Sequence, residues 1–126
     1  MATLSLLKAI ENGYQGALMA PTEILAAQHY EGIRTVCANL GITIELLTGS
    51  STKKEKECIY EGLADGRIQM IIGTHALIQE GVNFHNLGLV IIDEQHRFGV
   101  DQRARLQQKG TYPHVLIMTL HQSLVP

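Results

Sequence analysis

The chain has 126 residues, a formal net charge of −2, and 45% apolar against 17% charged residues, which are the totals of one ordinary globular domain. No apolar run approaches the ~20 residues that cross a membrane, and the net charge excludes a strongly basic chain, although a local basic face remains compatible with it. Cys37 and Cys58 are far apart and lack metal-ligand spacing; with no secretory signal pattern at the start, they predict a cytoplasmic protein with reduced thiols.

Helical and strand-like segments alternate along the chain. In order, we expect a helix at 3–13, a strand at 16–20, a helix at 23–40, a strand at 42–47, a helix at 53–66, a strand at 68–74, a short helix or turn at 75–81, a strand at 87–93, a helix at 99–110 and a strand at 114–119. Thr22 and Gly41 are suited to cap the second helix, and Ser51 or Thr52 to cap the third.

Short continuous apolar strands separated by helices predict a parallel sheet covered on both faces, an α/β doubly wound layout. In such sheets, ligands gather beyond the carboxyl ends of the strands. Polar residues follow three of the expected strands at that end: Pro21 to Glu23, Gly73 to His75, and Asp93 to His96. The sequence therefore predicts a functional edge built from these three segments.

The string "LVIIDEQHRFG" ends a buried strand in two acids. Because side chains alternate along a strand, Asp93 and Glu94 leave it in different directions. One acid is then free to hold a hydrated Mg²⁺ while the other orients a water, as nucleotide hydrolysis requires. The alternative, which is the more frequent case for the dipeptide alone, is that the two acids simply open a helix.

Other segments have both a binding and a structural interpretation. The helix start at Thr22 is suited to a phosphate but is also an ordinary strand–helix junction, and His75 alone is more often structural than a ligand. The polar, basic turn at 50–54 fits a sugar–phosphate backbone or a solvated cap. The segment that carries Arg97, Arg103, Arg105 and Lys109 is either a basic contact helix or an ordinary surface helix. We find no convincing zinc site, nucleophile elbow or dinucleotide-binding glycine pattern.

Several of these strings occur in one order that resembles a known family. "APTEILAAQHY", "GTHALIQEGVNFHNLGLVIIDEQHRFGVDQR" and "LIMT" closely resemble the first motor domain of the RecG type of ATP-dependent DNA helicase, a superfamily 2, DEAD/DEAH-like helicase. The resemblance runs from about Leu4 to Thr119 and implies a RecA-like P-loop NTPase fold. The transcription-repair coupling translocase is a second relative, but it normally has Glu where this chain has Gln95.

The resemblance implies a role for each matching residue. Asp93 would hold Mg²⁺ through water and Glu94 would face the attacking water, with Gln95 and His96 completing the DExH-type box. Nucleotide binding or coupling is implied for Arg97, Gln102 and Arg103. Contact with the DNA backbone is implied for Pro21, Thr22, Glu23, Gly49, Gly73, Thr74 and His75. The implied cofactors are ATP and Mg²⁺, and the implied partner is branched DNA, with no membrane.

Two departures from the family pattern affect the expected activity. The family's phosphate-binding loop needs a Gly-Lys dipeptide, and none occurs in this sequence. The tail "LHQSLVP" replaces the expected continuation, so we expect a partial RecA-like domain at 1–119 and a divergent tail at 120–126. We therefore expect a fragment of such a helicase, inactive alone and dependent on other chains for the missing parts. Its missing strand should leave the sheet with exposed edges and an uncovered face, and the chain marginal or prone to aggregate.

The functional prediction is thus part of an ATP-dependent DNA helicase that remodels replication forks and Holliday junctions in recombination and repair. The main alternative is a non-catalytic remnant or binding module that cannot hydrolyse ATP alone. A fragment of the coupling translocase is a further alternative, and an unrelated small α/β signalling domain would require the motif order to arise by chance.

Overall fold

The computed structural model describes residues 2–79, 81–93 and 116–120 of the chain. The helices in these ranges are α1 (Ala2–Glu11), α2 (Glu23–Leu40), α3 (Lys53–Asp65) and a 3-10 helix, η1 (His75–Ile78). The strands are β1 (Gln15–Met19), β2 (Ile44–Leu47), β3 (Met70–Gly73), β4 (Leu87–Asp93) and β5 (Leu116–Leu120). None of the described helices is both long enough and apolar enough to span a membrane.

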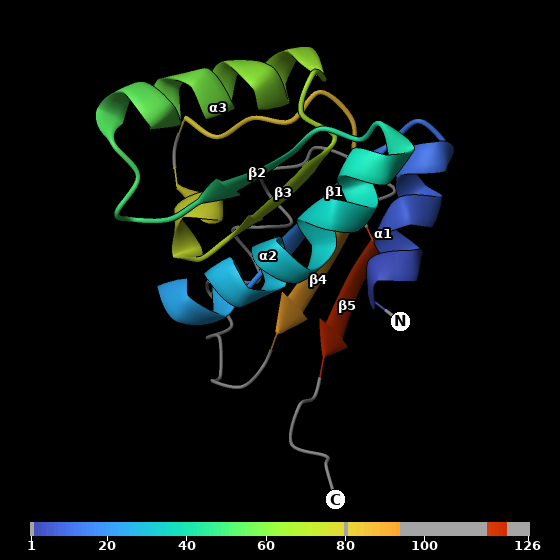
Figure 1. Ribbon diagram of the computed structural model, residues 1–126. Helices are drawn as coiled ribbons and strands as arrows, with labels where there is room; N and C mark the ends of the chain where they lie inside the picture. The colour runs from blue at the N-terminus through green and yellow to red at the C-terminus, as the bar shows by residue number, and fades with distance from the viewer. Residues whose placement is uncertain (1, 80, 94–115, 121–126) are drawn as a thin grey trace, which may run out of the picture.

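The five strands form one sheet in the order β2-β3-β1-β4-β5, and every neighbouring pair is parallel (Figure 1). The α/β fold class predicted from the short apolar runs is confirmed. The segment at 75–81, expected as a short helix or turn, begins with η1. The helix expected at 99–110 lies outside the described residues.

Among the described strands, the expected exposed edges of the sheet are present, and pairing between these two edges is continuous. β1 pairs with β3 on one side and β4 on the other, and β4 also pairs with β5. Pairing is therefore continuous from β2 to β5. Among the described strands, the free edges are those of β2 and β5, as in any open five-stranded sheet.

Both faces of the sheet are covered where side chains are described, because successive strand residues point to opposite faces. In β4, Leu89 and Ile91 face α1 and α2, whereas Val90 and Ile92 face α3 and η1. The first face buries Leu6, Ile10, Ala26, Ile33 and Cys37 of the helices, and the second buries Ile59, Leu63, Ala76 and Leu77. The expectation of an uncovered apolar face is therefore wrong over β1 to β4.

Local capping residues set the helix limits as the sequence predicted. The Thr22 hydroxyl accepts a hydrogen bond from the Leu25 N–H at 3.2 Å, and Gly41 ends α2 in the left-handed region with φ 72°. Of the two candidates for α3, Thr52 is the cap, and it forms a reciprocal capping box with Glu55. These bonds satisfy backbone groups that a helix end otherwise leaves unpaired.

Candidate functional site

The carboxyl ends of four neighbouring strands lie in register at one edge of the sheet. Gly73 ends β3 and is paired with Leu47 on one side and with Met19 on the other, while Met19 is also paired with Ile92. The predicted site residues lie at these ends or follow them closely. The structure thereby brings to one edge of the sheet Pro21, Thr22, Glu23, Gly49, Gly73, Thr74, His75 and Asp93.

The remaining predicted site residues lie outside the described residues, so their assignments stay predictions. They are Glu94, Gln95, His96, Arg97, Gln102 and Arg103.

Gly73 has a packing reason to be glycine that is independent of any ligand. A Cβ at this position would collide with the backbone carbonyl oxygen of Leu47 and would lie 3.1 Å from the side chain of Leu77. The neighbouring backbone is drawn close here: the Thr74 N–H donates to the Leu47 carbonyl at 3.4 Å, and the Ala20 N–H donates to the Gly73 carbonyl at 2.8 Å. Gly73 therefore allows the ends of three strands to pack together.

The loop after β2 is held in place by hydrogen bonds from its own residues. The Ser50 hydroxyl donates to the Glu23 carboxylate at 2.6 Å, which ties the loop to the first residue of α2. Within the loop, the Ser50 N–H donates to the Thr48 hydroxyl at 3.2 Å, and the Thr48 N–H donates to Ser51 Oγ at 3.1 Å. The Glu23 carboxylate therefore braces the Gly49–Ser50 loop against the start of α2, and its predicted contact with DNA stays a prediction.

The two threonines at the edge both serve as helix caps. The Thr22 hydroxyl accepts from Leu25, and the buried Thr74 hydroxyl accepts from the Ala76 N–H at 3.5 Å at the start of η1. A hydroxyl that accepts one bond still has a hydrogen to donate. Thr22 is only partly buried and retains that capacity toward a phosphate, whereas Thr74 is buried and His75 beside it is exposed.

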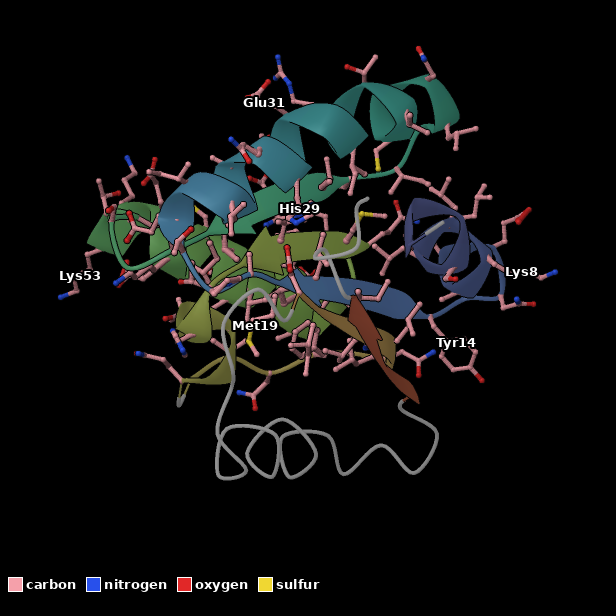
Figure 2. The ribbon with its side chains drawn as sticks, turned by 90° about the horizontal axis from the view of Figure 1, so that it is seen from below. Lys8, Tyr14, Met19, His29, Glu31 and Lys53 are labelled. Carbon is pink, nitrogen blue, oxygen red and sulfur yellow. The ribbon has the colours of Figure 1, made fainter. Side chains whose placement is uncertain are left out.

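Asp93 ends β4 with a fully buried side chain, and its Oδ2 lies 2.9 Å from Nε2 of His29. An ionised carboxylate can only accept, so with Asp93 in that form this contact requires the His29 tautomer that carries its hydrogen on Nε2. His29 belongs to α2 and is 22% exposed; Figure 2 shows it on the side of α2 that faces the sheet, whereas Glu31 points away. Sequence reasoning missed His29, although it follows Thr22 by seven residues, two helical turns, and so lies on the same helix face.

The Asp93 carboxylate is a suitable donor for Mg²⁺. In nucleotide sites this ion is usually held by one or two carboxylates, with water and phosphate oxygens completing the octahedron. Within the described part of the chain, no group of three or more acidic, His or Cys side chains forms a dedicated metal cage. A single strand-end carboxylate of this kind fits a phosphate-bound Mg²⁺ contacted through water.

Comparison with known proteins places this chain in a family. The family model described as DEAD/DEAH box helicase matches residues 1–121. The chain is 53% identical over 119 residues to the ATP-dependent DNA helicase RecG of Synechocystis sp.. This alignment covers 94% of the present chain but only 14% of the relative. The chain is 54% identical to RecG of Streptococcus pneumoniae and 53% identical to RecG of Escherichia coli, and it covers 17% and 18% of those chains.

Solved structures agree with this placement. A RecG structure bound to a three-way DNA junction superposes with a TM-score of 0.76 at 49% identity, with 94% of this chain and 16% of that chain covered. The second domain of the DEAD-box helicase Mss116p, bound to an RNA duplex, superposes with a TM-score of 0.79 at 12% identity, which shows a shared fold alone. The RecA-like fold predicted from the resemblance is thus confirmed, and the chain belongs to the DEAD/DEAH box helicase family.

Proposed function

We propose that this chain supplies part of the first motor domain of an ATP-dependent DNA helicase that acts on branched DNA. The observation that carries the proposal is the convergence at one sheet edge of a buried strand-end carboxylate, Asp93, with the helix start at Thr22 and the braced loop at Gly49. The 49% identity to a RecG structure determined on a three-way DNA junction supports branched DNA as the partner. Replication forks and Holliday junctions are the corresponding substrates in recombination and repair.

In this proposal, the strand ends divide the chemistry between nucleotide and DNA. Asp93 would hold Mg²⁺ through water, and the bound ion would supply positive charge for the phosphates of ATP. Glu94, in the adjacent position, orients the attacking water. Gln95 and His96, with Arg97, Gln102 and Arg103, connect the nucleotide to the rest of the motor.

The DNA side of the proposal uses hydroxyls and backbone N–H groups. The Thr22 hydroxyl and the start of α2 face a phosphate, because N–H groups at a helix start favour an anion. Glu23 holds the Gly49–Ser50 loop, which presents its backbone to the sugar–phosphate chain. Ser50 to Thr52 and Lys54 also line a hollow of about 660 Å³ beside β2, which extends the polar surface next to this loop.

ATP binding is the test of the nucleotide half. We expect the purified chain to bind Mg·ATP weakly, because the sequence contains no Gly-Lys dipeptide for the phosphates. Titration calorimetry measures this binding. The Asp93→Ala substitution should abolish the Mg²⁺-dependent part of the ATP affinity, whereas Gln28→Ala on the exposed side of α2 should leave that part unchanged. Mg²⁺-dependent binding that survives Asp93→Ala would contradict the assignment.

The second candidate function is a non-catalytic DNA-binding module. It is favoured by one observation: the described edge contains the predicted DNA contacts, whereas the phosphate-loop dipeptide is not in the sequence. Fluorescence anisotropy with a labelled three-way junction separates the two functions. Junction binding without any response to Mg·ATP would favour the module, and a change of junction affinity on adding Mg·ATP would favour the motor. The cytoplasmic location stays a prediction.

A further inference from the structure

We propose that His29 is a positioning residue for Asp93, through which α2 links the carboxyl end of β4 to the helix start at Thr22 and Glu23. The role of Asp93 toward Mg·ATP rests on the proposed function. The positioning bond itself rests on the contact between Nε2 of His29 and Oδ2 of Asp93, at 2.9 Å.

The burial of the pair makes this bond decisive for orientation. The Asp93 side chain is fully buried and that of His29 is largely so, with 22% exposed. A bond to an ionised acceptor is about twice as strong as a neutral one, and it fixes Oδ2 toward α2. Holding Oδ2 in this way also orients the carboxylate group as a whole. Hydrogen-bond partners behind a metal-binding carboxylate typically change metal affinity by about 10- to 100-fold.

The helix makes His29 a link between the two halves of the edge. Thr22 caps α2, Glu23 holds the loop through Ser50, and His29 lies two turns further along the same helix. Hydrogen bonds from each N–H to the carbonyl four residues earlier join the successive turns of the helix. A shift at the DNA-facing start of α2 therefore moves the imidazole that orients Asp93, and a change at Asp93 acts back on the start of α2.

The competing explanation is that His29 only fills space between α2 and the sheet. Two substitutions separate these explanations. His29→Leu introduces an apolar side chain of similar size and removes the donor, whereas His29→Gln keeps an N–H donor near the position of Nε2. Gln28→Ala is the matched control, because Gln28 is the preceding residue on the exposed side of the same helix.

The first experiment uses nuclear magnetic resonance on the 126-residue chain. The ¹⁵N spectrum of the imidazole should show the His29 hydrogen on Nε2. Amide exchange in the first two turns of α2 should accelerate by about tenfold or more in His29→Leu, and stay within about twofold in His29→Gln and Gln28→Ala. In an Asp93→Asn background, the effect of His29→Leu should shrink at least about threefold, because the charged acceptor is gone.

Two results would overturn the positioning role: an imidazole with a bare Nε2, or His29→Leu exchanging as slowly as Gln28→Ala. A separate titration with Mn²⁺·ATP, read by paramagnetic broadening at the end of β4, tests the function on which the role rests. If the wild type shows this broadening, His29→Leu should weaken the affinity for Mn²⁺·ATP about tenfold. An unchanged affinity would refute the link between His29 and the metal. Without broadening, the proposed nucleotide function of Asp93 fails, and the exchange data still decide whether His29 positions the carboxylate.

Discussion

Gly73→Ala tests the close approach of the strand ends that forms the candidate site. The added Cβ meets the Leu47 carbonyl, which is backbone and cannot rotate away, and it presses on Leu77. Overpacking of this kind costs about 1–3 kcal/mol, and the lower entropy of the unfolded alanine chain returns about 0.4–1 kcal/mol. We expect a net loss of about 1–2 kcal/mol in the free energy of unfolding.

Gly32→Ala is the matched control for this substitution. Gly32 is exposed within α2, and an added Cβ there meets nothing within 4 Å, so helix propensity alone should stabilise the chain by about 0.5–1 kcal/mol. Urea denaturation followed by circular dichroism measures both variants, and Gly73→Ala is introduced into the Gly32→Ala background if the wild type proves marginal. If Gly73→Ala unfolds within about 0.5 kcal/mol of its parent, the steric explanation is refuted and a ligand contact at Gly73 becomes the better one.

Three further predictions use the same denaturation assay or simple thiol chemistry. Gly41→Ala should cost about 1–2 kcal/mol, because the left-handed φ of 72° is strained for a residue with a Cβ; an unchanged midpoint would mean that α2 ends differently. Thr52→Ala removes the capping box with Glu55 and should cost about 1 kcal/mol, with Thr52→Ser as the variant that should retain most of the stability. Burial raises the pKa of Cys37, so its thiolate fraction at neutral or mildly alkaline pH is below that of an ordinary thiol. The exposed Cys58 should therefore react first with a thiol reagent. Equal labelling rates of the two cysteines, measured by mass spectrometry, would contradict the buried position of Cys37.

The sequence by itself determined which of the described segments form helices and which form strands, because that choice depends on local chemistry. Strand β4 was predicted at 87–93 and occupies Leu87–Asp93, since a short apolar run between turn residues specifies a buried strand without reference to its neighbours. The caps at Thr22 and Gly41 were equally predictable, because a side chain or a left-handed glycine satisfies groups within its own turn. The edge where the polar residues gather followed from the parallel layout alone.

The tertiary structure alone decided which strands are neighbours and which side chains meet. Local patterns do not encode strand order, so the order β2-β3-β1-β4-β5 appeared only with the pairing of β1 to both β3 and β4. His29 and Asp93 are 64 residues apart, and their bond exists because α2 packs across the sheet at the end of β4. Ser50 and Glu23 meet for the same reason, across 27 residues. Contacts at such separations depend on how the hydrophobic faces pack together, and that packing is a property of the whole fold.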